Sequence, residues 1–222
     1  MNRPRRARQN LARPTRRRDP KPRILVVCEG AVTEVDYLGG IKSLFKSLPV
    51  EVREVGVGRD PLAVVQHAVE LRNEAKRDAK RGKDDNLLFE QVWCLVDVDE
   101  HTRLPQALDL AWRQDVEIVV SNPCFEIWLL YHFQDYTSSV HRHVLCKEKL
   151  PQHIAGYDKR LPSGFPYSDH PTAKSRAQRA EQRHEGTRRA KDRNPSTGVW
   201  RVVEAIQQAG KSAGRSAGDG RS

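Results

Sequence analysis

The sequence predicts an α/β fold in which a parallel β-sheet core is followed by a helical C-terminal region. Up to residue 133, short apolar runs alternate with amphipathic stretches of about 10–15 residues, which is the pattern of βαβ units. Beyond residue 133 only helical patterns continue. With 222 residues and a mass of 25.3 kDa, the chain has the size of one domain with extensions.

The individual elements are predicted from the period of the apolar residues and from helix start signals. The runs that indicate buried strands cover residues 24–28, 50–57, 90–97 and 116–121. The helical patterns cover residues 33–48, 60–81, 104–114, 124–133, 144–154, 172–190 and 196–208. Asp60-Pro61 and Asn122-Pro123 each predict an N-cap followed by proline at the first helical position, and Thr33 predicts a capping-box variant.

Charge is distributed unevenly along the chain. The net charge of +10 combines +9 in residues 1–23, +5 in 172–193 and +2 in 210–222, which leaves −6 for residues 24–171. Such an acidic body would repel a polyphosphate unless metal ions or the basic extensions supplied cations. From composition we expect four regions: a disordered basic arm over 1–22, the α/β core over 23–135, a helical region packed on it over 136–209 and a disordered tail over 210–222.

Two classes of protein are excluded by the apolar runs. None approaches the roughly 20 residues that span a bilayer, and no apolar stretch follows the N-terminal arginines, so we expect neither a membrane helix nor a secretory signal. A cytoplasmic protein is therefore predicted. The four cysteines contain no C-x-x-C pair, and we interpret them as free thiols. His141, His143 and Cys146 have a spacing found in soft-metal sites, but without a second half they favour a solvated loop.

Acidic side chains follow the predicted strands at the edge where the strand-to-helix loops open. Glu29 comes directly after the first strand, and Asp97 and Asp99 end the strand that contains Trp93. Functional groups of parallel sheets gather at this edge. Because Asp97 and Asp99 point to the same side of an extended chain, they favour a divalent cation such as Mg²⁺ or Mn²⁺. The alternative, that these acids only belong to turns and helix starts, stays open.

Glu126 is the fourth candidate acid. It lies in a predicted helix that is apolar on nearly all sides, so an ionised carboxylate there needs a partner. Two alternatives stay open: the free N–H groups of the helix start satisfy it, or it is a further carboxylate of the metal-binding edge.

Several of these segments together resemble one known family. They are the stretch RILVVCEG from Arg23, then Thr33-Glu34 and Tyr37, the strand end Asp97-Val-Asp99, the block SNPCFEIWLLYHF at 121–133 and the late Asn194-Pro-Ser-Thr197. The chain resembles the RloB-like family over about residues 22–208, and the block at 121–133 is the most specific part. That family is associated with restriction-modification loci and phage abortive infection. The strand-end acids also look like a Toprim domain, the metal-binding α/β module of topoisomerases, primases and OLD-family nucleases.

The resemblance implies an antiviral nuclease that depends on Mg²⁺ or Mn²⁺. Glu29, Asp97 and Asp99 would be its metal-binding and catalytic acids, and Glu126 is a candidate catalytic acid that completes a second metal site. The substrate would be DNA or RNA, and an ABC-type ATPase from the same locus is an expected partner. The late segment 194–197 also matches the family, but as an ordinary helix start it is already explained, and we favour that interpretation.

A basic run on the predicted helix 172–190 is the candidate nucleic-acid-binding surface. Its members are Lys174, Arg176, Arg179, Arg183, Arg188 and Arg189. A solvated helix face balanced by Glu181 and Glu185 is an equal alternative. At the level of function, the alternative to a nuclease is a non-catalytic nucleic-acid-binding or sensor module of a defence complex. A strand-rejoining enzyme is disfavoured, because the five tyrosines lack a recognisable setting for transesterification.

Overall fold

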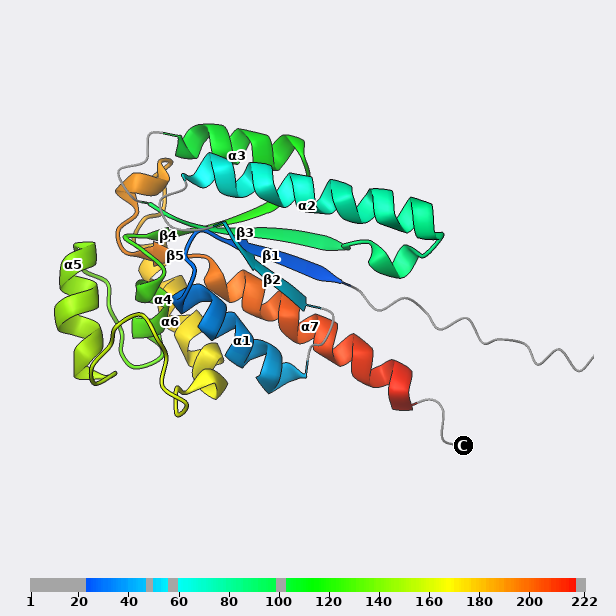
Figure 1. Ribbon diagram of the computed structural model, residues 1–222. Helices are drawn as coiled ribbons and strands as arrows, with labels where there is room; N and C mark the ends of the chain where they lie inside the picture. Colours follow the sequence, from blue (N-terminus) through cyan, green and yellow to red (C-terminus); the bar gives the residue numbers. More distant parts are fainter. Residues whose placement is uncertain (1–22, 47–49, 56–59, 99–102, 219–222) are drawn as a thin grey trace, which may run out of the picture.

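A five-stranded sheet with helices on both faces forms the part of the chain that the computed structural model describes, which is residues 23–46, 50–55, 60–98 and 103–218 (Figure 1). Its strands are β1 (Ile24–Cys28), β2 (Val50–Glu54), β3 (Gln91–Asp97), β4 (Glu117–Asn122) and β5 (Ser196–Thr197). Their order is β2-β1-β3-β4-β5; β1 to β4 are parallel, and β5 is antiparallel to β4. The predicted α/β class is confirmed.

The helices fill the connections and the C-terminal half. They are α1 (Thr33–Phe45), α2 (Pro61–Gly82), α3 (Leu104–Arg113), α4 (Glu126–Tyr131), α5 (Arg142–Val144), α6 (His170–Gln182) and α7 (Val199–Gly218). Short 3₁₀ or π turns are η1 (Asp85–Leu87), η2 (Leu145–Lys149), η3 (Leu150–Gln152), η4 (Tyr167–Asp169) and η5 (Ala190–Asp192). α2 begins as predicted, because the Asp60 carboxylate accepts a hydrogen bond from the Ala63 N–H at 3.0 Å and Pro61 follows the cap. No helix of the described residues is long and apolar enough to cross a membrane.

Both faces of the sheet are buried, which explains the unbroken apolar run of β1. Leu25 and Val27 pack in the cluster under α2 and α3, while Val26 and Cys28 pack in the larger cluster toward α1, α4, α6 and α7. Figure 1 shows these two layers of helices on opposite sides of the sheet. Burying each such side chain contributes about 1.5–3 kcal/mol, so β1 is held from both sides.

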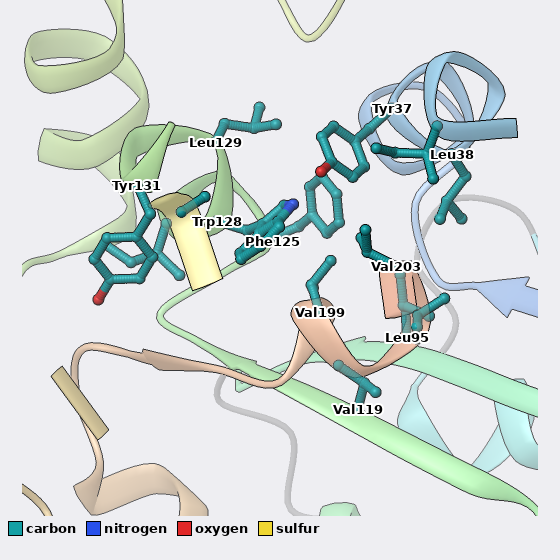
Figure 2. Packing of buried hydrophobic residues seen from close by; sticks show 14 of the residues in the cluster. Tyr37, Leu38, Leu95, Val119, Phe125, Trp128, Leu129, Tyr131, Val199 and Val203 are labelled. Carbon is teal, nitrogen blue, oxygen red and sulfur yellow. The ribbon is translucent and has the colours of Figure 1, made fainter. Parts of the chain in front are cut away.

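Aromatic side chains of α1 and α4 meet in the larger cluster. The Tyr37 ring packs edge-on against Phe125 and Trp128, with centroid distances of 5.7 and 6.1 Å. Figure 2 shows these rings beside Val199 and Val203 of α7. All five residues are buried. The C-terminal helix therefore shares one apolar core with the elements that precede it.

Two predicted helix caps are wrong. At α1 the cap residue is Val32, without a side-chain hydrogen bond, because the Thr33 hydroxyl donates to the backbone carbonyl of Lys159 at 2.8 Å. At α4 the helix begins four residues after Asn122, whose peptide bond to proline is cis. The Asn122 side-chain amide donates instead to the carbonyls of Ala190 and Lys191, at 2.9 and 3.1 Å. Both polar side chains thus form hydrogen bonds with backbone carbonyls far along the chain and do not cap the helices.

The C-terminal half also differs from the predicted helices. The stretch 144–154 is divided among α5, η2 and η3, and α6 ends at Gln182 rather than 190, before Gly186 adopts a positive φ of 82°. Ser196 and Thr197 form the edge strand β5 instead of a helix start, and the Thr197 hydroxyl lies 2.9 Å from that of Ser121. The helix predicted there begins at Val199.

α7 continues through residue 218, where composition predicted a disordered tail from residue 210. Its buried face repeats at three- and four-residue intervals, through Val199, Val202, Val203, Ile206 and Ala209. A helix nucleated by such a face propagates readily into the alanine-containing segment that follows it, because each added residue costs little once the first turns exist. The last four residues, 219–222, and the predicted arm, 1–22, lie outside the described part.

Candidate functional site

The parallel register of β1 and β3 brings two of the predicted acids together. Cys28 pairs with Leu95, so the residues after Cys28 run beside the end of β3. The Glu29 carboxylate oxygen Oε2 accepts a hydrogen bond from the Asp97 N–H at 3.4 Å. Two acids separated by 68 residues in sequence thus meet at the carboxyl edge of the sheet, as the strand pattern predicted.

The Asp97 side chain is held by two donors and is only 10% exposed. Its Oδ1 accepts from the Phe125 N–H at 2.9 Å, and its Oδ2 accepts from an Arg142 guanidinium nitrogen at 3.1 Å. Burial, followed by the nearby carboxylates of Glu126 and Glu34, raises the pKa of Asp97 well above its usual range, although Arg142 acts in the opposite direction. The arginine therefore does not cancel the combined effects of burial and of the neighbouring acids on Asp97.

Glu34 is a fourth carboxylate at this edge, and the sequence pattern did not select it as a site residue. Its carboxylate lies so close to Gly30 that a Cβ added there would be 2.3 Å from Oε2, so a larger residue at position 30 would displace this carboxylate. Burial, together with the charges of Glu126 and Glu29, raises the pKa of Glu34 to about 7, while its own backbone and Lys159 partly oppose this. The acids at this edge thus repel one another in the absence of a cation.

Glu126 is the first residue of α4 and is 5% exposed. Its Oε1 accepts a hydrogen bond from the Tyr157 hydroxyl at 3.1 Å, and that hydroxyl lies 3.1 Å from the Thr33 hydroxyl. The side-chain partner of this buried acid therefore comes from a segment 31 residues away, whereas the sequence considered only helix-start N–H groups or a metal.

The residues that complete the edge come from the irregular segment between α4 and α6. Arg142 neutralises part of the Asp97 charge, and Tyr157 holds Glu126. Tyr157 lies in no recognisable motif, and Arg142 is not one of the residues that the spacing of its own stretch, 141–146, selected, so only the three-dimensional contact identifies them. The two exposed histidines of the H-R-H-V-L-C stretch do not meet the acids in any described contact, whereas its arginine does.

Asp99, the third predicted metal ligand, lies outside the described residues. Among those the structure describes, one trio of His, Cys, Asp or Glu brings its ligand atoms within 4.8 Å of one another, and it consists of Cys124, Glu126 and Cys146. The oxygens of Glu29 and Asp97 are not part of such a trio. With Asp99 unplaced, the donor set of the edge is nevertheless the hard oxygen set that Mg²⁺ and Mn²⁺ favour, and a cation there would relieve the repulsion among its carboxylates.

The predicted basic run does not converge on these acids. Lys174 pairs with Glu204, Arg179 pairs with Asp135, and Arg176 donates to the Tyr131 carbonyl at 2.8 Å. Beyond these, Arg183 donates to the Thr137 hydroxyl, Arg189 pairs with Asp192, and Arg188 is exposed. Because α6 ends at residue 182, Arg183, Arg188 and Arg189 follow the helix rather than extend its face. Their role in nucleic-acid binding stays a prediction.

Comparison with known proteins supports the resemblance stated from the sequence. The family model described as RloB-like protein matches residues 24–206, which is most of the chain. A search of curated proteins gives no match, and a search of solved structures gives none either.

Proposed function

Because the chain belongs to the RloB-like protein family, we propose that it is a metal-dependent nuclease with a Toprim-like core, which hydrolyses phosphodiester bonds of DNA or RNA in phage defence. One observation supports this most strongly. Acids from separate parts of the sequence, Glu29 after β1 and Asp97 at the end of β3, meet at the carboxyl edge of a parallel sheet beside an arginine. An edge of this kind can bind a cation and, through it, an anionic substrate.

Glu29, Asp97 and Asp99 would hold Mg²⁺ or Mn²⁺. The bound ion would supply an activated water and stabilise negative charge on the phosphate and the leaving oxygen. The mutual repulsion of the carboxylates supports this assignment, because a divalent cation would relieve it. Glu126, held by Tyr157, is the further acid of the proposed catalytic set.

Arg142 is the cation we assign to the reacting phosphate. Its guanidinium lies 3.1 Å from Asp97 Oδ2 and its side chain is 42% exposed, so it can contact a ligand at the edge while it stays close to the acid. A planar guanidinium donates two parallel hydrogen bonds to a phosphate, which a lysine cannot do. Loss of one such donor to the transition state costs about 10²–10³ in kcat.

Binding of the polyanion itself is assigned to the basic extensions. The arm 1–22 and the run from Lys174 to Arg189 both carry a net positive charge, while the body is acidic. Release of counterions from the nucleic acid by these side chains supplies sequence-independent affinity. In this proposal the protein acts in the cytoplasm with an ABC-type ATPase partner from the same locus.

A non-catalytic nucleic-acid-binding or sensor module is the second candidate. The observation that favours it is the engagement of both Asp97 oxygens by protein donors, Phe125 N–H and Arg142. If those contacts persist in solution, Asp97 has fewer lone pairs directed at an ion, and the edge would be a structural charge cluster.

The two candidates are separated by cleavage assays on the full chain. Labelled DNA and RNA are incubated with the wild type, Glu29→Gln and Asp97→Asn, with Mg²⁺, Mn²⁺ or a chelator. Glu74→Gln, at an exposed position on α2, is the matched control. The nuclease proposal expects metal-dependent cleavage by the wild type and the control, and loss of cleavage with retained binding in the two site variants. Equal binding without cleavage in all four proteins would support the sensor module instead.

A further inference from the structure

Two thiols and one carboxylate converge beside the acidic edge but belong to a different ligand class. The Sγ atoms of Cys124 and Cys146 and a carboxylate oxygen of Glu126 all lie within 4.8 Å of one another. Ligands that stand about 2.0–2.3 Å from a tetrahedral Zn²⁺ ion are separated by about 3.3–3.8 Å, so the present spacing needs only small inward movements. We propose that Cys124, Cys146 and Glu126 form a binding site for a thiophilic divalent cation, with Zn²⁺ as its expected ion.

The three ligands come from segments that the fold itself positions. Cys124 lies in the connection from β4 to α4 and is fully buried, and Glu126 begins α4. Cys146 lies in η2, a π-helical turn of the irregular C-terminal segment, and is half-buried. An ion at this place would join the end of the parallel sheet to that segment. Because π-helical turns interrupt the regular hydrogen-bond ladder, they are frequent where a side chain must be aimed at a ligand.

The ligand chemistry favours a soft or borderline cation over Mg²⁺. Two thiolates with one carboxylate suit Zn²⁺, whereas Mg²⁺ requires an octahedral set of oxygens. The Tyr157 hydroxyl donates to Glu126 Oε1 at 3.1 Å, as a second ligand layer does when it orients a coordinating carboxylate. A carboxylate accepts several hydrogen bonds or ions, so this contact leaves Glu126 able to bind the cation. Three protein ligands leave a fourth position for water or another small ligand.

Apolar packing alone does not account for this cluster. A free thiol packs as a small hydrophobe, and Cys28 and Cys94 do so in the two cores. Cys124 lies in the larger core and Cys146 packs against it, but their two sulfur atoms also have a buried carboxylate within reach. The proposed site shares Glu126 with the proposed catalytic set. It goes beyond the proposed nuclease activity, since neither thiol is among the Mg²⁺ ligands of that proposal, which are Glu29, Asp97 and Asp99.

A cation bound at this site would also influence where Arg142 lies. Cys146 follows Arg142 by four residues, and Arg142 reaches Asp97. A cation bound by Cys146 and Glu126 would therefore fix the η2 segment at the point from which Arg142 extends. The cation has a structural role in this proposal: it sets the place of a segment and takes no part in phosphate chemistry.

Cobalt binding tests the proposal without any nucleic acid. The full chain is purified with a non-thiol reductant, stripped with a chelator and titrated with Co²⁺, and Zn²⁺ is then added as competitor. We expect one equivalent of Co²⁺ to produce thiolate-to-metal absorption in the near ultraviolet and the strong visible bands of a tetrahedral ion, with displacement by Zn²⁺. Cys146→Ser should weaken Zn²⁺ affinity by at least roughly 10–100-fold, which is the loss seen when only a hydrogen-bond partner of a metal ligand is removed. Cys94→Ala, buried on the opposite face of the sheet, should bind as the wild type does.

Three results would overturn the proposal. The first is the absence of thiolate-to-cobalt absorption in the wild type. The second is equal cobalt binding by the wild type and Cys146→Ser, or, if circular dichroism shows that this variant is misfolded, by the wild type and Glu126→Gln. The third is a Cys124–Cys146 disulfide in the freshly purified protein, detected by the mass added on thiol alkylation under denaturing conditions. None of these measurements depends on cleavage, so failure of the nuclease proposal leaves this test intact.

Discussion

Neutralising Glu34 should stabilise the protein at alkaline pH. Glu34 is 9% exposed, and its buried carboxylate faces the charges of Glu126 and Glu29. In the folded state it keeps its proton up to about pH 7, whereas in the unfolded chain it releases the proton near pH 4.5. Between these values the folded state binds more protons, so the free energy of unfolding falls as the pH rises. The loss is absent below about pH 4.5 and complete above about pH 7.

The magnitude follows from the two pKa values. A rise from 4.5 to about 7 corresponds to about 3 kcal/mol, at about 1.4 kcal/mol per pH unit. The Glu34→Gln variant keeps nearly the same shape and is neutral at every pH. It should therefore gain up to about 3 kcal/mol in unfolding free energy at pH 8 and close to nothing at pH 4. With saturating Mg²⁺ the difference at pH 8 should narrow, because an ion bound by the neighbouring acids would stabilise the wild type more.

Urea denaturation followed by circular dichroism measures the effect. The wild type, Glu34→Gln and the exposed control Glu74→Gln are compared at pH 4 and pH 8 in the presence of a chelator. The control should match the wild type at both values. A Glu34→Gln variant that is no more stable than the wild type at pH 8, or that gains equally at both pH values, would show that burial and the neighbouring carboxylates do not raise the pKa of Glu34 in solution.

Three further predictions address the fold and the binding of nucleic acid. Burial lowers the pKa of His132 from 6.5 to about 4, so its ring should stay neutral at pH 5.5. Because the unfolded chain binds this proton first, the free energy of unfolding should fall as the pH drops from about 6.5 to about 4, and NMR ring shifts of the folded protein that titrate near pH 6.5 would contradict this. Gly40→Ala places a Cβ 2.2 Å from the Tyr167 ring and should lower unfolding free energy by about 1–3 kcal/mol, whereas its neighbour Gly39→Ala, with open space, should raise it by about 0.5–1 kcal/mol in thermal or urea melts. Deletion of residues 1–22 should weaken nucleic-acid binding and flatten its salt dependence, and an unchanged slope in a salt titration would assign affinity to other residues.

The strands and their edge could be predicted from the sequence because they depend on short-range patterns. β1 reads as an apolar run because both of its faces are buried, and every parallel strand opens its following loop at the same edge. The meeting of Glu29 and Asp97 follows from these two facts alone. The start of α2 is equally local, since its Asp60 cap and Pro61 lie within one turn of each other.

Local sequence patterns did not predict the contacts of polar residues whose partners are distant in the sequence. Thr33 and Asn122 both have the residue type of a helix cap, yet their side chains bond backbone carbonyls 126 and 68 residues away, respectively. Capping competes with any other acceptor that the fold brings within reach, and a local pattern contains no information about that acceptor. Ser196 and Thr197 are a third case: they were predicted to start a helix, but they pair with the edge of β4 as an antiparallel strand.

The irregular segment after α4 is therefore part of the candidate site and not merely a cover for it. It contributes Arg142 to Asp97, Tyr157 to Glu126 and Cys146 to the trio with Cys124. Each of these contacts joins a residue of the sheet edge to one that lies more than 20 residues later in the sequence. Since the edge acids alone would repel one another, the segment supplies the positive charge and hydrogen-bond donors that let them remain buried. The chemistry of this edge thus depends on residues that the sequence patterns did not assign to it. Substitutions of these residues should alter the site while the α/β core stays folded.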